Sequence, residues 1–304
     1  MCYAGICINS FIGGYMSTKE ERAAEARKHI GTMKGIFEKE IIDSAERTVL
    51  YEDGIGRNLD IPEPENESTH AVIAWKPLPK ALAEASGKVC VVDPAHFTRP
   101  AGGYFNGSKD PESQLCMESN LAPILEKLND SFYLKNKQGS RGGLNSDHAA
   151  YIPDVIFTTD GIMHKCDVLV ISPVNRRMAL ENNRSEAECG IDMSYRIEAL
   201  MRIGAANAAQ TLIVNDFGCG YFENDIKIVA SMFSAWLNEH PGIFKKVVFA
   251  IPGGPSLDAF KEFFPLEEKE SQDELRPVLN DDEDDSEEWE IDVEPVSDGR
   301  WVFE

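Results

Sequence analysis

Short runs of consecutive apolar residues recur along the chain and alternate with longer stretches whose apolar positions are three or four apart. The first pattern is typical of strands buried on both faces, and the second of helices that bury one face. The runs predict strands at residues 48–51, 70–75, 88–93, 155–157, 167–172, 211–215 and 246–251. This alternation predicts an α/β fold in which helices cover both faces of one sheet.

Four stretches carry the helical spacing. Helices are predicted at residues 18–40, 77–85, 185–209 and 225–239. In the first of these, Ile30, Met33, Ile36 and Phe37 fall on one face, which predicts that this face packs on the core. Thr18, or the serine before it, is placed to cap the helix because its hydroxyl can accept a hydrogen bond from a free backbone N–H.

The charge balance narrows the classes of function. The chain has 304 residues with 30 Lys+Arg against 52 Asp+Glu, a formal net charge of −22. Such a surface repels a phosphate backbone, so direct nucleic-acid binding is not expected, although backbone N–H groups can still hold a small anion. No stretch approaches the roughly 18 uninterrupted apolar residues of a membrane span. The first 15 residues lack the basic segment of a signal peptide, so no membrane partner is expected.

Acidic residues dominate the end of the chain, and residues 281–290 are nearly all Asp or Glu. Because like charges repel, residues 266–304 are predicted to form an acidic tail. Two interpretations stay open, a solvated flexible tail and an arm that binds a basic partner.

Seven cysteines are spread widely, and none forms a C-x-x-C pair. This usage fits a reducing compartment, cytoplasm or nucleus. No group of His, Cys, Asp and Glu has the spacing of metal ligands, so neither a metal nor a cofactor is expected.

Two glycine-containing loops follow buried strands. The first glycine loop is residues 94–107, and the second is residues 215–225. Loops at the carboxyl ends of strands form the ligand crevice of open α/β sheets. Glycine permits close approach of the backbone to a ligand, and successive N–H groups can hold phosphate. The alternative is that these glycines only make turns.

The sequences of both loops resemble those of one enzyme family. Residues 92–115 are similar to the ligand loop of microbial-type poly(ADP-ribose) glycohydrolases of the macrodomain superfamily, whose pattern is N-F-A-x-x-x-N-P-G-G-G, seven residues, then Q-E-E. Residues 218–225 resemble the family motif G-C-G-V-F-x-N-D. Further similar segments, in the same order, are residues 151–157, 170–175, 196–205 and 244–251.

The resemblance implies a three-layer macrodomain-like fold with a mixed sheet. Its core would be residues 89–265, with residues 1–88 as an N-terminal extension of the same domain. It also implies that the partner is ADP-ribose or an ADP-ribosylated protein. The diphosphate and distal ribose would contact the two loops. By resemblance, the ligand-binding positions are Asp93, His96, Ala101, Gly102, Gly103, Gly218, Cys219, Gly220, Tyr221, Phe222 and Asn224.

The triplet after the first loop departs from the family pattern. Gly103 is followed by a spacer of seven residues, 104–110, and then by Pro111-Glu-Ser113. Glu112 therefore matches the first glutamate of the family triplet, and Ser113 stands where the family has its catalytic glutamate. A serine hydroxyl is far too weak an acid to replace a carboxylic acid. The same residues also read as a plain helix start, with Asp110 as the cap and proline at the first position.

Three functions remain open on this sequence. The first is an ADP-ribose-binding pseudoenzyme with weak or absent glycohydrolase activity. The second is an active glycohydrolase that uses Glu112, or else His96 or Asp93, as its acid. The third is another nucleotide hydrolase on the same scaffold, because a fold does not fix a reaction.

Overall fold

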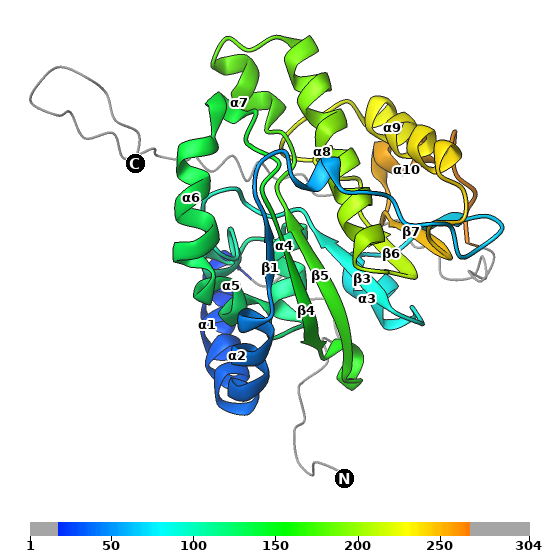
Figure 1. Ribbon diagram of the computed structural model, residues 1–304. Coiled ribbons are helices and arrows are strands. Elements are labelled where there is room, and N and C mark those ends of the chain that lie inside the picture. Colours follow the sequence, from blue (N-terminus) through cyan, green and yellow to red (C-terminus); the bar gives the residue numbers. More distant parts are fainter. Residues whose placement is uncertain (1–17, 268–304) are drawn as a thin grey trace, which may run out of the picture. The chain divides into compact units, whose positions relative to one another are not determined.

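A seven-stranded mixed sheet forms the centre of the computed structural model, which describes residues 18–267 (Figure 1). The strand order is β1-β4-β5-β3-β6-β7-β2, in which β5, β3, β6, β7 and β2 are parallel and β4 is antiparallel to both β5 and β1. The strands are β1 Val49–Tyr51, β2 His70–Ala74, β3 Val89–Asp93, β4 Ala149–Phe157, β5 His164–Ile171, β6 Thr211–Val214 and β7 Lys246–Ala250. The predicted α/β fold and all seven predicted strand positions are confirmed.

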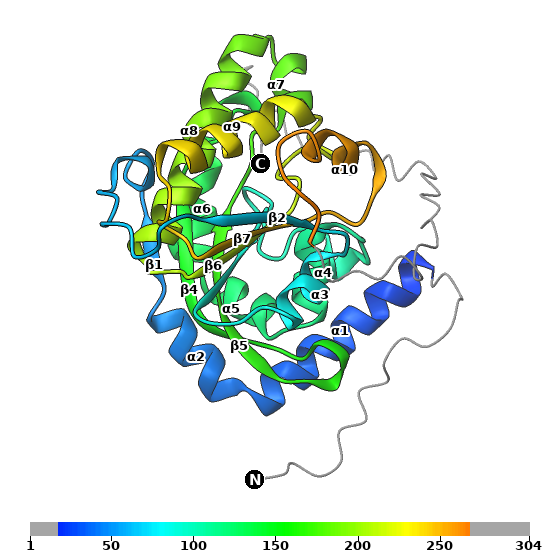
Figure 2. The same cartoon turned by 90° about the vertical axis from the view of Figure 1, so that its right-hand side faces the viewer.

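Helices lie on both faces of this sheet (Figures 1 and 2). They are α1 Lys19–Ile36, α2 Glu38–Glu46, α3 Leu78–Ala83, α4 Pro111–Met117, α5 Leu121–Lys127, α6 Leu134–Asn136, α7 Arg176–Glu181, α8 Glu186–Ala206, α9 Ile226–Glu239 and α10 Gly254–Phe260. Alternate residues of one strand point to opposite faces. Val91 of β3 therefore joins the core under α1 to α5, whereas Cys90 and Val92 join the core under α8, α9 and α10.

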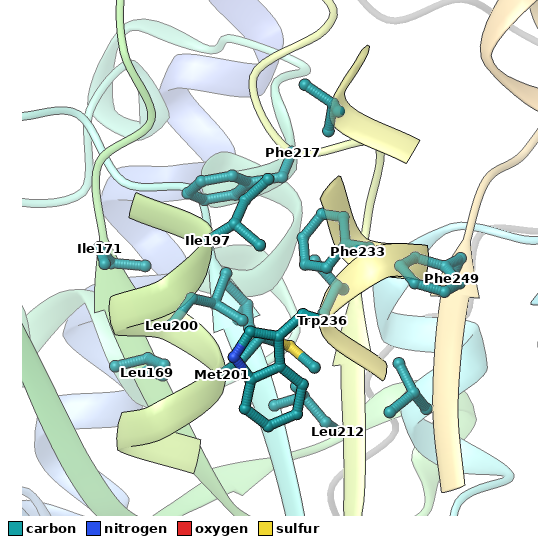
Figure 3. Close-up of a cluster of buried hydrophobic side chains, with 14 of the residues drawn as sticks. Leu169, Ile171, Ile197, Leu200, Met201, Leu212, Phe217, Phe233, Trp236 and Phe249 are labelled. Atoms are coloured by element: carbon teal, nitrogen blue, oxygen red, sulfur yellow. The ribbon is translucent and has the colours of Figure 1, made fainter. Parts of the chain in front are cut away.

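The larger of the two cores lies between the sheet and the long helices α8 and α9 (Figure 3). Leu200 and Met201 of α8 meet Leu212 of β6 there, and Phe233 and Trp236 of α9 cover the neighbouring strand. All five are buried. Burial of side chains of this size stabilises the fold by about 1.5–3 kcal/mol each. The sheet edge that carries the loops is thus fixed on a rigid support.

The helix predicted at residues 18–40 is divided in the structure. Thr18 caps α1 as expected, in a capping box with Glu21. The chain then breaks at Phe37, and α2 begins at the next residue. Because the axis turns there, Ile41 reaches the core, whereas Ile36 is 46% exposed. The prediction that Ile36 lies on the buried face is wrong.

Strand β4 is longer than the sequence pattern indicated. Pairing with β5 runs from Ala149, and the register shifts between Ile152 and Val155. The two residues inside this bulge include a proline, which has no N–H to donate, and Asp154, whose φ is +56°. This interruption obscures the first half of the strand in the sequence.

Some predictions fall on other parts of the chain. Residues 268–304, the bulk of the predicted acidic tail, and the first 17 residues, with Cys2 and Cys7, lie outside the described residues. At the end of the described range, the N–H of Glu267 donates to the carbonyl of Ile73 in β2. Within residues 18–267, no helix has both the length and the apolar composition needed to cross a bilayer.

Candidate functional site

The two glycine loops leave the same edge of the sheet. Strand β3 pairs in parallel with β6, with Val89 opposite Thr211 and Val91 opposite Ile213. Their carboxyl ends therefore lie side by side, and the first and second glycine loops begin there. This is the edge at which open α/β sheets hold their ligands.

The first glycine loop folds tightly over the start of α4. Ala101 is buried with φ +58°, and Gly102 follows with φ +46°. A Cβ atom on Gly102 would overlap Oε2 of Glu112, and one on Gly103 would lie 2.6 Å from Cβ of Ser108. Both glycines are therefore required by the packing of the loop itself. Ala101 takes the left-handed conformation at a cost of about 1–2 kcal/mol for a residue with a side chain.

Helix α4 begins as the sequence predicted. Oδ1 of Asp110 accepts a hydrogen bond from the N–H of Ser113 at 2.6 Å, and proline occupies the first helical position. Glu112 is buried, and its Oε2 accepts a hydrogen bond from the backbone N–H of His96 at 2.8 Å. Oγ of Ser113 is buried with no hydrogen-bond partner among residues 18–267. The carboxyl of Glu112 is thus anchored beneath the first loop.

Buried acidic groups gather at the end of β3. Asp93 is fully buried, and neither carboxyl oxygen has a hydrogen-bond partner within the described range. Burial raises the pKa of Asp93 well above its usual value, and the Asp110 carboxylate adds to the shift. Burial likewise raises the pKa of Glu112, and the charges of Asp93 and Asp110 raise it further. The hydrogen bond from the His96 backbone acts in the opposite direction and lowers it. The site therefore retains protons at a pH where ordinary carboxyl groups are ionised.

Tyr133 belongs to the same cluster and was not anticipated from the sequence. It lies in a single π-helical turn, Asn129–Tyr133, and its buried hydroxyl has no partner in the part of the chain that the structure describes. Burial raises its pKa, and the nearby charges of Glu112 and Asp93 raise it further. No local motif marks this tyrosine, because its neighbours are distant in sequence.

His96 has a structural role within its loop. Its Nδ1 accepts hydrogen bonds from the N–H groups of Thr98 and Arg99, both at 3.2 Å. Burial, assisted by the charge of Arg99, lowers the pKa of His96 to about 3. A histidine that is neutral at physiological pH has no proton to give as a strong general acid, so this arrangement disfavours His96 in that role.

In the second glycine loop, Gly218 and Asn224 hold the backbone in place. Gly218 has φ +76°, and a Cβ there would lie 2.6 Å from Cβ of Pro173. Nδ2 of Asn224 donates to the carbonyls of Val174 at 2.7 Å and Gly218 at 2.8 Å. Cys219 is buried between them. These contacts tie the loop to the segment after β5, so the Asn224 amide is engaged within the protein.

The open side of this loop is formed by Gly220, Tyr221 and Phe222. A Cβ on Gly220 would meet no heavy atom within 4 Å, and Tyr221 is 45% exposed. The Arg177 guanidinium lies 5.5 Å from the centre of the Tyr221 ring, and the backbone N–H of Arg177 donates to the carbonyl of Phe222 at 3.2 Å. Arg176 donates to the carbonyl of Glu223 at 2.9 Å. Neither arginine of α7 was predicted from the sequence. Each guanidinium also pairs with a carboxylate, that of Arg176 with Glu186 and that of Arg177 with Glu181, so both carry partly balanced positive charge beside the loop.

Helix α1 forms a wall of the first loop. Nε of Arg22 donates to the carbonyl of Gly107 at 2.6 Å, and a Cβ on Gly107 would overlap the carbonyl of Lys19. The Tyr104 hydroxyl donates to the carbonyl of Ala26 at 3.0 Å and lies 2.8 Å from Nδ1 of His29. The N-terminal helix and the loop therefore fit together without space between them.

Among residues 18–267, no group of three or more His, Cys, Asp and Glu side chains is arranged to hold a metal ion. The five cysteines of this range, Cys90, Cys116, Cys166, Cys189 and Cys219, are all free and buried.

Many functions are possible at the edge of a sheet that carries two such loops, and a comparison with known families reduces their number. Residues 23–160 match the family model of the microbial-type PARG catalytic domain, where PARG denotes poly(ADP-ribose) glycohydrolase. The resemblance is confirmed. This PARG-type match contains the first loop, Glu112 and Ser113, and the second loop lies beyond it. No curated protein matches the chain.

Solved structures extend the comparison over both loops. PARG from Thermomonospora curvata has 22% sequence identity and a TM-score of 0.72, over 81% of this chain and 100% of that one. The same enzyme bound to the inhibitor ADP-HPD has 23% identity and a TM-score of 0.70, over the same shares. PARG from Deinococcus radiodurans in complex with ADP-ribose has 23% identity and a TM-score of 0.65, over 73% of this chain and 95% of that one. The chain therefore has the PARG fold.

Proposed function

We propose that this chain binds ADP-ribose, free or attached to a protein, and cleaves poly(ADP-ribose) weakly or not at all. The proposal is supported by the PARG-type match of residues 23–160 and by the similar Deinococcus radiodurans structures in complex with ADP-ribose. Both ligand loops leave neighbouring strands at one edge of the sheet.

In this proposal the diphosphate lies against residues 218–220. Free backbone N–H groups in a concave loop bind phosphate even on an acidic protein. The space around Gly220 is open, and the Arg177 guanidinium, which pairs with Glu181 at 3.8 Å, lies beside the Tyr221 ring. The distal ribose lies near Gly102 and Gly103, beside the carboxyl cluster of Asp93 and Glu112.

The proposal of low activity rests on a single observation, the serine at position 113. Cleavage of a glycosidic bond needs a carboxylic acid to protonate the leaving oxygen. At the matching position this chain has a hydroxyl, which retains its proton throughout the physiological range. Glu112 is the adjacent carboxyl, and its Oε2 is occupied by the His96 N–H.

One observation favours a second candidate, an active glycohydrolase with Glu112 as the acid. Burial and the charges of Asp93 and Asp110 raise the pKa of Glu112, as a general acid at neutral pH requires. Its other oxygen, Oε1, is buried and has no hydrogen-bond partner among the described residues.

Turnover of purified poly(ADP-ribose) separates the two candidates. The wild-type chain, Ser113→Glu, Glu112→Gln and the matched control Ser113→Ala are compared for released ADP-ribose, and binding of ADP-ribose is measured in parallel. We expect Ser113→Glu to raise the rate, by up to about 10²–10⁴-fold, because that is the usual contribution of general acid catalysis. Ser113→Ala removes the hydroxyl without adding an acid, so it should remain as slow as wild type.

The contrary results are specific. If wild type is fast, Glu112→Gln abolishes turnover and Ser113→Glu gives no gain, then Glu112 is the acid and the pseudoenzyme proposal is wrong. Fast turnover that survives Glu112→Gln contradicts both candidates and directs attention to Asp93. Absence of ADP-ribose binding by the wild-type chain contradicts the binding proposal itself.

A further inference from the structure

A hollow lies at the loop-bearing edge of the sheet, beside β1 and β4. Its volume is about 220 Å³. The lining residues are Glu52, Asp53, Lys135, Asn136, Gln138, Gly139, Ser146 and His148. Glu52 and Asp53 directly follow β1, and His148 directly precedes β4, whose first residue pairs with the last residue of β5. We call this hollow the β1–β4 pocket.

The β1–β4 pocket shares a wall with the first glycine loop. Nδ2 of Asn136 donates to the carbonyl of Phe97 at 2.8 Å, and a Cβ on Gly139 would lie 3.6 Å from the Phe97 ring. Phe97 is the residue after His96. A group bound in this pocket therefore lies next to the loop at which we place the distal ribose.

The hydrogen bonds around His148 determine which nitrogen of its ring carries the proton. Because Nδ2 of Asn136 donates to Phe97, Oδ1 of Asn136 faces Nδ1 of His148, at 2.6 Å. An amide oxygen only accepts, so Nδ1 carries the proton. Burial lowers the pKa of His148 and keeps the ring neutral. The other ring nitrogen, Nε2, is then a hydrogen-bond acceptor. It is buried and has no partner among residues 18–267, and His148 as a whole is 4% exposed.

Two carboxylates complete a set of acceptors. Oε1 of Glu52 lies 3.0 Å from Nζ of Lys135, and this ion pair lowers the pKa of Glu52. Oδ1 of Asp53 accepts a hydrogen bond from the backbone N–H of Asp147 at 3.0 Å. Arg57 forms an ion pair with the Asp147 carboxylate, also at 3.0 Å, rather than with Asp53. Lys135 is thus the one cation in the lining, against two carboxylates. The lining residues themselves therefore carry a net negative charge, with the cations Arg57 and Arg196 close to Asp53. Their acceptor groups suit a ligand rich in hydrogen-bond donors.

We infer that the β1–β4 pocket binds the guanidinium of an arginine side chain on the protein that carries ADP-ribose. This inference rests on the proposed function. The pocket is smaller than the roughly 300–1,000 Å³ of sites that enclose whole ligands, so it takes a side chain rather than a nucleotide. A planar guanidinium has five N–H donors and no acceptor, which matches the lone pair of His148 and the carboxylates of Glu52 and Asp53.

The test compares two ADP-ribosylated peptides that differ only in one residue beside the modification, arginine or its neutral isostere citrulline. Affinities are measured by calorimetry for wild type, for Glu52→Gln, for Glu52→Lys and for Glu84→Gln. Glu84 is a matched control because its side chain is 62% exposed like that of Glu52 and pairs with a lysine, Lys76, at 2.9 Å. It lines a different hollow, with Val248 of β7.

Wild type should bind the arginine peptide about 1.5- to fivefold more tightly than the citrulline peptide, the effect of one partly exposed charge pair. Glu52→Gln should remove most of this preference, Glu52→Lys should reverse its sign, and Glu84→Gln should leave it intact. Free ADP-ribose should bind equally to all four proteins.

Equal affinity of wild type for the two peptides, while free ADP-ribose still binds, overturns the pocket inference and leaves the proposed function standing. Weaker binding of free ADP-ribose to Glu52→Gln also overturns it, because the pocket would then belong to the nucleotide site. Absence of free ADP-ribose binding in wild type overturns the proposed function and the inference with it.

Discussion

A bulky side chain in the second glycine loop should affect different properties at two nearby positions. It should reduce the stability of the fold at Gly218 and the affinity for the ligand at Gly220. Gly218 is half-buried and has φ +76°, whereas Gly220 is exposed and a Cβ there meets nothing within 4 Å. Replacing each with valine therefore separates what the fold requires from what the ligand requires.

At Gly218 the structure predicts a loss of stability. The left-handed conformation costs a residue with a side chain about 1–2 kcal/mol, and a β-branched residue more. The new Cβ would also lie 2.6 Å from Cβ of Pro173 and 2.9 Å from Nδ2 of Asn224, so one of these must move. We expect Gly218→Val to lower the free energy of unfolding by at least about 2 kcal/mol, a fall in Tm of about 4–8 °C for a domain of this size.

At Gly220 the fold should not change, and the ligand should bind less well. A surface substitution without strain alters stability by at most about 0.5 kcal/mol. The valine side chain would occupy the open space in which we place the diphosphate. Loss of one N–H bond to a charged oxygen costs about 1.5–3 kcal/mol, which is roughly a ten- to hundredfold loss of affinity.

Thermal unfolding gives the stability, and calorimetry with ADP-ribose gives the affinity. Gly31→Val is the control, since Gly31 is also exposed and its Cβ direction is open, on α1 away from this loop. Unchanged ADP-ribose affinity in a folded Gly220→Val would show that the diphosphate does not lie on this loop. A Gly218→Val protein as stable as wild type would refute the steric reasoning.

Two further predictions concern buried polar groups. Because the pKa of Asp93 is raised in the folded state, the native protein binds more protons than the unfolded chain above about pH 4, so its stability falls as the pH rises from there. Asp93→Asn should flatten that fall in urea titrations between pH 5 and 8, and an unchanged slope would show that Asp93 is not its source. Tyr104→Phe leaves the carbonyl of Ala26 and Nδ1 of His29 without the hydroxyl. It should cost about 1–3 kcal/mol in the same titration, and a loss below 0.5 kcal/mol, roughly that of a neutral surface change, would contradict the contact.

The sequence was most informative about the sheet and the edge at which its loops meet. An uninterrupted apolar run such as that of β3 is typical of a strand buried on both faces, and parallel strands place their following loops together. The cap at Asp110 was readable because capping depends on neighbours within one turn. Strand β4 was only half visible, because a bulge at Asp154 interrupts its pattern.

Other features depend on contacts that no local pattern encodes. Tyr133 reaches the carboxyl cluster from a π-helical turn, and His148 reaches Asn136 twelve positions away. The exposure of Ile36 follows from a bend at Phe37 that helical spacing alone does not predict. For the site, the positions of the loops could be foreseen, but the anchoring of Glu112 by the His96 backbone could not.

The close fit between α1 and the first glycine loop has a consequence for how the molecule opens. Gly107 has no room for even a methyl group against Lys19, and Arg22 and Tyr104 bridge the two segments. Segments joined in this way unfold as one cooperative unit. The backbone amides of Gly107 and of α1 should therefore exchange with deuterium at a shared rate, slower together than the amides of Gly220 and Tyr221, the exposed part of the second loop. The N-terminal helix would then set how often the loop beneath which Glu112 is anchored becomes accessible to solvent.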